Sequence, residues 1–292
     1  MSWLIVSSCS TNRYKTDEEM NSIVEVERSI IKKYRKQIYS PFIKAIKDYE
    51  MIKDNDHIAV CISGGKDSLL LAKCLEILQR YSDIDFKVSY IAMNPGFSDD
   101  NYQLLANNCQ RLGIDVNIFD TDIFAVANKI SKDYPCYICA KRRRGALYNF
   151  AQELGCNKIA LGHHFDDIIE TTMLNVLYAG CYGAMLPRIY SDNYEGMELI
   201  RPLCYVREKD IINYTLYNHI QPMNCGCQVA AKKTSSKRRA VKELLTTLRN
   251  EDPLIDKSIF ASMRNVNLDT VESFRYQQQR YNYLHLKEDN DK

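Results

Sequence analysis

The sequence predicts a doubly wound α/β fold, in which helices cover both faces of a parallel sheet, with N-terminal helices and a C-terminal helical extension. Strand-like runs alternate with helical segments over residues 57–179. The first of these strands breaks into a turn with two adjacent glycines, which leads directly into a helix. The chain has 292 residues and 46% hydrophobic content, which is enough to bury one sizeable core or two modest ones.

Two helices are expected before the first strand, over residues 18–35 and 41–52. Ser40 can cap the second helix, and Pro41 suits its first helical position. The strands that follow read HIAVCIS, KVSYIAMN, DVNIFDT and NKIALG. The helices between and after them are expected over residues 67–81, 98–112, 123–131, 140–154 and 166–179. Such alternation predicts right-handed crossovers, with ligands bound beyond the carboxyl ends of the strands.

The alternation ends near residue 185, where ELIRPLCYVREKDIINYTLYNHI predicts a short extended piece and then a helix. Further helices are expected over residues 236–250 and 254–264, followed by a polar tail that we expect to be frayed. The chain therefore divides into four parts: an N-terminal helical segment (1–52), an α/β domain (53–205), a C-terminal helical region with cysteines and basic residues (206–270), and a tail (271–292).

The composition excludes several classes of protein. The longest apolar runs are far shorter than the roughly 18 residues that a membrane span needs. The start, MSWLIVSSC, has four consecutive apolar residues and no basic residue before them, so we expect no secretory signal and a cytoplasmic location. Eleven cysteines, an odd number in such a chain, argue against a framework of disulfides.

Eight of the eleven cysteines fall into two groups. Four lie in or beside apolar stretches, where a free cysteine behaves as a small core residue: Cys61, Cys74, Cys109 and Cys156. Two pairs have closer spacing: Cys136 with Cys139, and Cys225 with Cys227. The C-x-x-C pair can bind zinc, perform thiol exchange or ligate an iron–sulfur cluster.

Basic residues are clustered although the net charge is only +2. Three groups stand out: KRRR at 141–144, the run from Arg28 to Lys36, and a stretch between Cys225 and Asn250 in which Glu243 is the one acidic residue. The basic residues of this stretch are Lys232, Lys233, Lys237, Arg238, Arg239, Lys242 and Arg249. Local basic patches attract phosphates, and the competing explanation for each is a solvated helix face. We expect Arg143, Lys237, Arg238 and Arg239 to contact RNA.

The turn after the first strand predicts an anion site. It reads Ser63-Gly64-Gly65-Lys66-Asp67-Ser68, and we call residues 63–68 the glycine turn. A strand, this turn and a helix place several backbone N–H groups and a positive helix terminus around one point. Lys66 adds a charge, and Asp67 can hold Mg²⁺, which prefers carboxylate and phosphate oxygens. The spacing is neither that of a Walker loop nor G-x-G-x-x-G, and a nucleotide polyphosphate is the expected ligand.

A second polar motif, GHHFDD, follows the fourth predicted strand and should face the same nucleotide. Its members are Gly162, His163, His164, Asp166 and Asp167. Two adjacent carboxylates can bind magnesium, and a histidine pair can donate hydrogen bonds to phosphate. Asp166 also suits the N-cap of the helix that follows, so a functional role is favoured for His163 and Asp167.

The motif S-G-G-x-D-S resembles the pyrophosphate-binding loop (PP-loop) of the N-type ATP pyrophosphatases, an adenine nucleotide alpha hydrolase-like fold whose members cleave ATP between the α and β phosphates. Residues 136–180, from CYICAKRRRG to NVLYAG, and IRPLCYVREKDI at 200–211 resemble the tRNA 2-thiocytidine synthetase family. The resemblance covers about residues 40–265. It implies the cofactors ATP, Mg²⁺ and a [4Fe-4S] cluster.

The resemblance also assigns roles to residues. It implies that three cysteines hold the cluster, with one iron open to receive sulfide: Cys136, Cys139 and a third cysteine in NCGCQV. Cys225 precedes a glycine, as the family's ligand does, and is preferred to Cys227, although the family's preceding cysteine is absent here. A fourth ligand from this pair would favour zinc instead. The nucleotide is expected to contact Ser63, Gly64, Gly65, Lys66, Asp67, Ser68, Gly162, His163 and Asp166, with Lys66, Asp67 and Asp167 catalytic.

The predicted function is ATP-dependent thiolation of tRNA, in which a base carbonyl, cytidine C2 in the first place, is adenylated and then attacked by sulfur. The expected partners are tRNA and a sulfur donor such as a cysteine desulfurase or free sulfide, and a homodimer is compatible with the sequence. Three alternatives stay open: 2-thiouridine synthesis by the same chemistry, a lysidine-type tRNA amidine ligase, and a non-catalytic redox-sensing RNA-binding protein.

Overall fold

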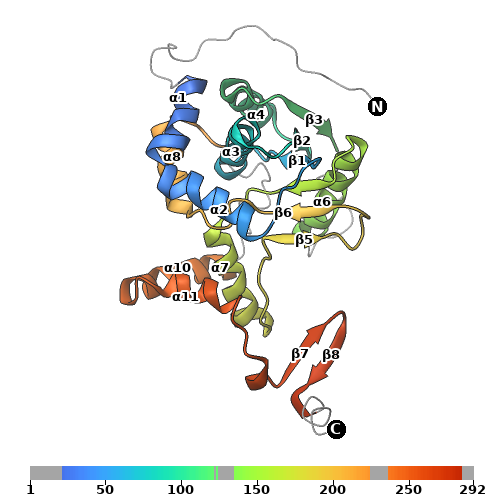
Figure 1. Cartoon of the computed structure of the whole chain (residues 1–292), viewed down its shortest axis with the longest axis vertical. Coiled ribbons are helices and arrows are strands. Elements are labelled where there is room, and N and C mark those ends of the chain that lie inside the picture. Colours follow the sequence, from blue (N-terminus) through green and yellow to red (C-terminus); the bar gives the residue numbers. More distant parts are fainter. Residues whose placement is uncertain (1–21, 122, 124–134, 224–235, 285–292) are drawn as a thin grey trace. The chain divides into compact units, whose positions relative to one another are not determined.

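The computed structural model describes residues 22–121, 123, 135–223 and 236–284 (Figure 1). The chain divides into two compact units. The first comprises Met1–Ile168 and Met185–Arg239, and the second Ile169–Ala184 and Ala240–Lys292. Within the described ranges, no helix has both the length and the apolar character that crossing a membrane requires.

The first unit is built on a six-stranded sheet with the strand order β3-β2-β1-β4-β6-β5. Its strands are β1 (His57–Cys61), β2 (Lys87–Asn94), β3 (Val116–Asp120), β4 (Lys158–Ala160), β5 (Arg188–Tyr190) and β6 (Glu198–Ile200). The four strands predicted from sequence are parallel to one another, as expected. Strand β6 extends the parallel sheet beside β4, and β5 pairs antiparallel with β6 at the edge. The sheet is therefore mostly parallel, and β5 is a strand that the sequence did not predict. Strand β5 reads Arg-Ile-Tyr, with one aliphatic residue, so it has no apolar run that would predict it.

The strand order creates a topological switch point between β1 and β4. The chain moves from β1 outward to β2 and β3, and then returns to β4 on the other side of β1. Connections that leave β1 and β4 in opposite directions open a crevice at the carboxyl ends of these two strands. The glycine turn follows β1 and GHHFDD follows β4, so both polar motifs lie at this crevice.

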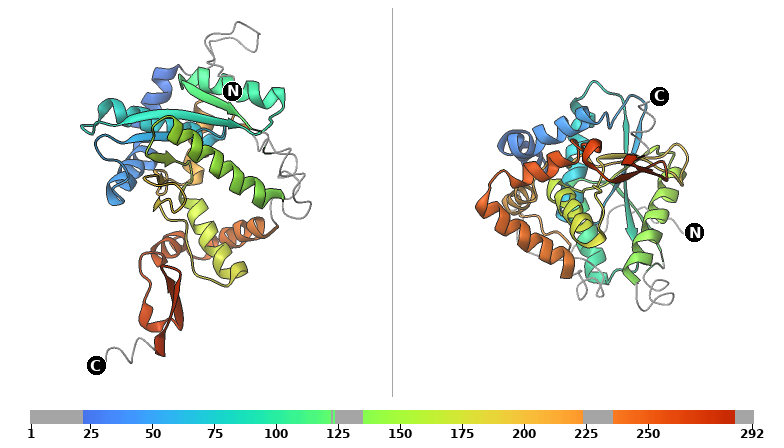
Figure 2. Two further views of the ribbon diagram at one scale, coloured as in Figure 1. Left: turned by 90° about the vertical axis from the view of Figure 1, so that its right-hand side faces the viewer. Right: turned by 90° about the horizontal axis from the view of Figure 1, so that it is seen from below.

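Helices cover both faces of the sheet, which confirms the doubly wound prediction (Figure 2). Helix α3 (Lys66–Tyr81) packs on β1 and β2, and α6 (Pro135–Glu153) packs on β2 and β4 from the opposite face. Helix α4 (Asp99–Leu112) ends at Gly113, whose positive φ of 66° completes a left-handed cap. The predicted helix over 123–131 lies, apart from residue 123, outside the described residues.

The core between the sheet and α6 contains several of the predicted core cysteines. Ala59, Cys61 and Ile91 pack with Phe150 and Cys156. All four cysteines expected in the core are buried: Cys61, Cys74, Cys109 and Cys156. Burial raises the pKa of Cys61 and Cys109 to about 12, so these thiols stay protonated and unreactive near neutral pH.

The N-terminal helices form one winding segment that packs beside α8 (Glu208–Tyr217). The segment consists of α1 (Ile23–Arg28), the π-helical turns η1 (Ser29–Lys33) and η2 (Arg35–Tyr39), and α2 (Ser40–Asp48). Ser40 does not cap a separate helix as predicted, because Tyr39 before it already has helical φ and ψ. A hydrogen bond from Asn218 Nδ2 to Ser29 Oγ (3.1 Å) joins η1 to the residue after α8.

The described residues of the second unit form helices and one hairpin. Its elements include η3 (Asn175–Ala179), which continues from α7 (Phe165–Leu174), the greater part of α10 (Ser236–Glu251), α11 (Ile255–Ser262), η4 (Leu268–Thr270), β7 (Ser273–Tyr276) and β8 (Gln279–Asn282). The hairpin corrects our expectation of a frayed tail from residue 271. Gln277 and Gln278 both have positive φ, 48° and 65°, which is the geometry of a two-residue hairpin turn.

Candidate functional site

The glycine turn has the geometry of an anion cradle. Gly64 has φ +78°, and Gly65 forms the N-cap of α3 with extended backbone angles. The hydroxyl of Ser68 donates to the carbonyl of Gly65 (2.9 Å), and it accepts from the backbone N–H of Ser63 (3.2 Å). These bonds fix the turn so that the first N–H groups of α3 point out of the helix start, where an anion is stabilised.

Lys66 lies between two carboxylates at the start of α3. Its Nζ is 3.2 Å from Asp67 Oδ2 and 3.1 Å from Glu208 Oε1. Burial alone would lower the pKa of Lys66, but the charges of Asp67 and Glu208 outweigh it and raise the pKa above its ordinary value. Lys66 is therefore a permanent cation at neutral pH. Glu208 belongs to α8, so this contact brings a third element to the site.

Asp67 is the least satisfied polar group of the cluster. Its Oδ1 is buried and has no hydrogen-bond partner among the described residues. Burial raises the pKa of Asp67, although His164 and Lys66 act in the opposite direction. A buried carboxylate oxygen without a donor is energetically unfavourable by itself, so it points to a ligand that supplies positive charge.

The loop after β4 packs directly on the start of α3. A Cβ atom on Gly162 would lie 3.0 Å from the carbonyl carbon of Asp67 and 3.0 Å from the backbone nitrogen of Ser68. Only glycine therefore lets the two motifs approach this closely. His164, two residues further on, places its Nε2 atom 3.8 Å from Asp67 Oδ1.

His164 and Asp167 cap α7 by reciprocal hydrogen bonds. The backbone N–H of His164 donates to Asp167 Oδ2 (3.1 Å), and the backbone N–H of Asp167 donates to His164 Nδ1 (3.3 Å). This arrangement has the spacing of a capping box. Because Nδ1 is an acceptor, a neutral His164 carries its proton on Nε2, the nitrogen closer to Asp67.

His163 faces a different partner. Arg201 Nε donates to His163 Nδ1 (3.3 Å), and the Arg201 guanidinium also donates to the carbonyl of Leu186. Burial and the nearby positive charge of Arg201 lower the pKa of His163 to about 4. His163 is therefore neutral at pH 7 and can donate a hydrogen bond from Nε2, but it supplies no charge to a phosphate.

Asp166 is engaged in holding another helix. Its Oδ2 accepts from the backbone N–H of Glu208 (2.8 Å) and lies 3.4 Å from Arg207 Nε. Asp166 was predicted to be the N-cap of α7. Helix α7 begins at Phe165, however, so Asp166 is inside the helix and the N-cap prediction is wrong. By binding the start of α8, Asp166 positions Glu208 beside Lys66. Direct contact of Asp166 with a nucleotide stays a prediction.

The predicted cysteine ligands are only partly described. Cys136 and Cys139 are the second and fifth residues of α6, which begins at Pro135. Cys225 and Cys227 lie outside the described residues. In the described ranges, no group of three or more His, Cys, Asp or Glu side chains forms a ready metal site.

The basic residues expected to bind RNA have different environments. Lys237 and Arg239 are exposed on α10, whereas Arg238 Nη2 lies 3.2 Å from Asp167 Oδ1. Arg143 is partly buried on α6. Arg238 thus belongs to the polar cluster around the two motifs, which the sequence did not predict.

Sequence reasoning also missed Arg201 and Glu208 as members of the site. Both stand in the stretch IRPLCYVREKDI, whose resemblance to the family belongs to the whole stretch and does not distinguish these two residues. A charged residue at the end of a buried strand, as Arg201 is after β6, was the available signal. No local pattern distinguishes Glu208 from other acidic residues in a first helical turn.

The comparisons with known proteins agree with this geometry. The PP-loop domain model of the ATP_bind_3 family matches residues 29–223. The chain is 36% identical over 233 residues to the tRNA-cytidine(32) 2-sulfurtransferase of Geobacter sulfurreducens, covering 79% of this chain and 90% of the relative. It is also 36% identical to the tRNA-cytidine(32) 2-sulfurtransferase of Shewanella pealeana, covering 89% and 82%.

A solved structure shares the fold. The U34-tRNA thiolase NcsA from Methanococcus maripaludis, determined with its [4Fe-4S] cluster, superposes with a TM-score of 0.63. Its sequence identity to this chain is 21%, and the match covers 82% of this chain and 78% of that one. The likeness establishes the arrangement of sheet and helices described above.

Proposed function

Because this chain belongs to the PP-loop family and, within it, to the tRNA-cytidine(32) 2-sulfurtransferases, we propose that it uses ATP to replace the C2 oxygen of cytidine 32 in tRNA with sulfur. The observation that carries the proposal is the convergence of the glycine turn, Lys66, Asp67, Asp167 and Glu208 at the switch point of the sheet. This cluster offers phosphate-binding amides, a cation and an unsatisfied carboxylate in one place.

In the first step the cytidine is activated. The C2 oxygen attacks the α-phosphorus of ATP, the bond from this phosphorus to the oxygen bridging the β-phosphate breaks, and pyrophosphate leaves with the bonding electrons. The amides at the start of α3 and the Lys66 ammonium stabilise the negative charge that develops on the phosphate oxygens. His164 can donate from Nε2 on the same side as Asp67.

In the second step sulfur replaces oxygen. A sulfide attacks C2 of the adenylated base, the C2–O bond breaks, and AMP leaves with the original oxygen. The sulfur would come from a donor such as a cysteine desulfurase or free sulfide. Lys66, which keeps its charge because its pKa is raised, stabilises the departing phosphate in this step as well.

Asp67 fits a magnesium ion. Its Oδ1 is buried and has no hydrogen-bond partner among the described residues, and hard cations prefer carboxylate oxygens. Mg²⁺ held there together with ATP oxygens would neutralise phosphate charge. Since the described residues contain no ready set of three ligands, Asp67 would need phosphate oxygens and water to complete the coordination.

The cysteines of α6 fit an iron–sulfur cluster. Cys136 is the second residue of α6 and Cys139 the fifth, so both are near the helix N-terminus, where the positive end of the dipole favours thiolates. The stretch that contains Cys225 follows Met223, and the backbone N–H of Met223 donates to the carbonyl of Gly64 in the glycine turn (2.9 Å). We propose Cys225 as the third ligand. A cluster with one iron free of protein ligands would supply a binding place for sulfide.

The proposal is tested with anaerobically purified protein, ATP, sulfide and tRNA transcripts that carry C32 or U32. We expect release of pyrophosphate and formation of 2-thiocytidine only with the C32 transcript, measured by a coupled phosphate assay and by mass spectrometry of the nucleosides. The matched variants are Asp67→Asn, expected to be inactive, and Lys209→Ala, an exposed neighbour of Glu208 that should retain activity.

Thiolation of U34 without any reaction at C32 would identify the chain as a thiouridine synthase. Addition of lysine to the base would identify an amidine ligase. Binding of tRNA without pyrophosphate release from ATP would identify a non-catalytic RNA-binding protein. Each of these results would contradict the proposal.

A further inference from the structure

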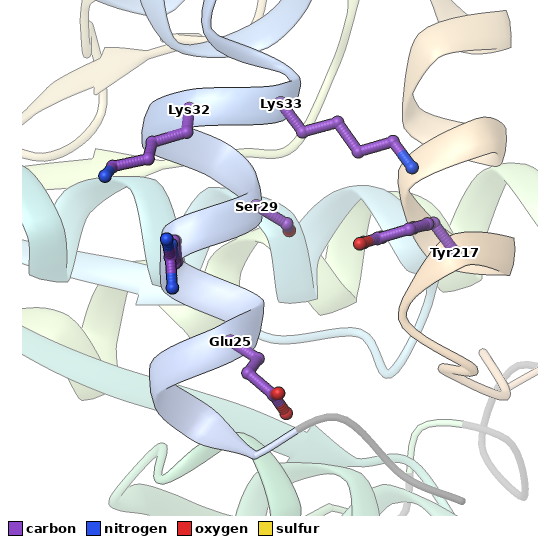
Figure 3. A pocket seen from close by; sticks show the side chains of 6 residues that line it. Glu25, Ser29, Lys32, Lys33 and Tyr217 are labelled. Atoms are coloured by element: carbon purple, nitrogen blue, oxygen red, sulfur yellow. The ribbon is translucent and has the colours of Figure 1, made fainter.

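A basic hollow of about 260 Å³ lies between the N-terminal helices and α8, outside the nucleotide site (Figure 3). Its lining consists of Glu25, Arg28, Ser29, Lys32, Lys33 and Tyr217, and we call this set the basic hollow. We propose that the basic hollow binds the phosphate backbone of the tRNA substrate. The inference rests on the proposed function, because that function makes tRNA the substrate.

The cations of the basic hollow are not neutralised by its one acidic residue. Glu25 Oε2 accepts from the backbone N–H of Ser22 (2.8 Å), which completes a capping box at the start of α1. Arg28, Lys32 and Lys33 are exposed, and no ion pair joins them to a carboxylate in the part of the chain that the structure describes. A surface that combines three cations with one engaged carboxylate favours a polyanion.

The backbone beneath these cations is a π-helical turn. Ser29, Lys32 and Lys33 all belong to η1, which spans Ser29–Lys33. Such turns are rare and occur frequently at functional sites. The hydrogen bond from Asn218 to the buried Ser29 hydroxyl anchors this turn to the end of α8, so the floor of the hollow is fixed.

The directions of Lys32 and Lys33 suit binding of several phosphates along an RNA strand better than binding of one small anion. Lys33 Nζ lies 3.3 Å from the ring centroid of Tyr217, and Figure 3 shows Lys33 reaching across to α8 while Lys32 extends to the other side. These two lysines therefore extend in different directions and do not converge on one point. Because Lys33 already covers a face of Tyr217, that face is closed to base stacking, and contacts to phosphate without sequence preference are expected.

The basic hollow is connected to the nucleotide site by one helix of the same unit. Glu208, which pairs with Lys66, begins α8, and Tyr217 ends it. A helix that rises 1.5 Å per residue separates these two residues by about 14 Å. Arg111 donates to the carbonyls of Asn218 and His219, which follow α8. These two carbonyl oxygens are therefore hydrogen-bonded and repel a nearby anion less. A tRNA strand held here would lie near a base placed beside Lys66, which favours RNA over an acidic protein as the occupant.

The test is tRNA binding by full-length protein at several salt concentrations, measured by fluorescence anisotropy. The triple variant Arg28→Ala, Lys32→Ala, Lys33→Ala should bind tRNA at least about tenfold more weakly at 0.1 M salt, and the slope of log K against log salt should fall by about 2 to 3. The matched control removes three exposed lysines outside the hollow: Lys47→Ala, Lys53→Ala and Lys87→Ala. ATP affinity and melting temperature should be the same in all three proteins.

A second variant tests the same idea by a gain of binding. Glu25→Gln removes the negative charge from the rim, while glutamine can still complete the capping box. We expect tRNA to bind about two- to fivefold more tightly, because an opposing charge is lost from the site. Misfolding of the variant would not produce tighter binding.

The triple variant should release pyrophosphate at the wild-type rate once tRNA is saturating, with a raised KM for tRNA. Equal tRNA affinity and salt slope in the triple variant and the wild type would overturn the proposed RNA site. If the triple variant binds tRNA normally but no longer binds an acidic protein partner, the basic hollow is the binding site of that partner. This result would also overturn the proposed RNA site. If the wild type itself releases no pyrophosphate with tRNA, the proposed function fails, which is a separate result.

Discussion

Asp67 is the residue whose environment is least stable without a ligand. Its carboxylate has a raised pKa because of burial, and one of its oxygens has no hydrogen-bond donor among the described residues. A group in this state lowers folding stability when it is ionised, so its presence is explained by binding of a cation or by catalysis.

We expect Asp67→Asn to lower the rate of tRNA-dependent pyrophosphate release by at least about 100-fold, because a neutral amide cannot hold Mg²⁺ or balance Lys66. The free energy of unfolding in urea should be no lower than in the wild type, since the substitution removes an unfavourable buried charge. A variant that keeps pyrophosphate release would exclude Asp67 from the mechanism.

His163 makes stability dependent on pH. Its pKa is lowered from 6.5 to about 4 in the folded protein by burial and by Arg201. Between pH 6.5 and pH 4, this histidine therefore binds a proton in the unfolded chain but not in the folded chain. The contribution of neutral His163 to the free energy of unfolding is complete above pH 6.5 and is lost as the pH falls toward 4.

We expect the wild type to lose about 2 kcal/mol more unfolding free energy than His163→Asn when the pH is lowered from 7 to 5. Urea unfolding at both pH values measures this difference. Equal losses in the two proteins would show that His163 titrates as it does in the unfolded chain.

At the level of elements, the site depends on how closely three helix starts approach one another. The start of α3 carries Lys66 and Asp67, the start of α7 is capped by His164 and Asp167, and the start of α8 brings Glu208. Gly162 permits the first two to meet, and Asp166 ties α8 to α7.

Gly162→Ala should therefore disturb the site through the backbone. The added methyl group would lie 3.0 Å from backbone atoms of Asp67 and Ser68, which cannot move aside as a side chain could. We expect a loss of about 1–3 kcal/mol in unfolding free energy and a weaker affinity for ATP, measured by urea unfolding and calorimetric titration. The control is Gly155→Ala, where the added methyl meets no atom within 4 Å and the positive φ of 73° accounts for any strain. Unchanged ATP affinity in Gly162→Ala would mean that the contact between the two loops does not shape the site.

The elements that the sequence predicted correctly are those with a strong local pattern. Helices α3 and α4 and strands β1 to β4 have apolar periodicity, and their positions are confirmed to within a few residues. Helix α6 begins five residues before the predicted residue 140, and the hairpin of β7 and β8 was missed because Gln277-Gln278 lacks the usual Asn-Gly signal.

For the whole molecule, the sequence predicted which loops meet but not which distant residues complete them. The two motifs follow parallel strands, so their meeting at one sheet edge could be predicted. Arg201, Glu208 and Arg238 reach the site because β6, α8 and α10 pack near the two motifs. No sequence pattern links these elements to the motifs, so their packing could not be predicted. The cluster cysteines could be selected only by spacing and resemblance.

The cluster and the nucleotide site should be separable by mutation. We expect Cys136→Ala to lose the visible absorption of an iron–sulfur cluster and all thiolation, while tRNA-dependent pyrophosphate release continues, because the adenylation residues are on other elements. The control Cys181→Ala removes an exposed free thiol and should keep both activities. Protein that contains tightly held zinc and no iron would contradict the assignment of a cluster.

The hydrogen bond between Met223 and Gly64 suggests that the affinities for ATP and for the cluster depend on each other. Met223 packs beside Gly64 and stands two residues before Cys225 in the sequence. If Cys225 is the third cluster ligand, as we propose, binding of the cluster and binding of ATP both act on this contact. Thermodynamic linkage then requires reciprocity: if the loaded cluster changes the Kd of ATP by some factor, ATP changes the equilibrium affinity for the cluster by the same factor. Titrating a non-hydrolysable ATP analogue into cluster-loaded and cluster-free protein, and an iron chelator into protein with and without that analogue, measures both factors. Identical nucleotide affinities in the two forms would show that adenylation and sulfur delivery are energetically independent.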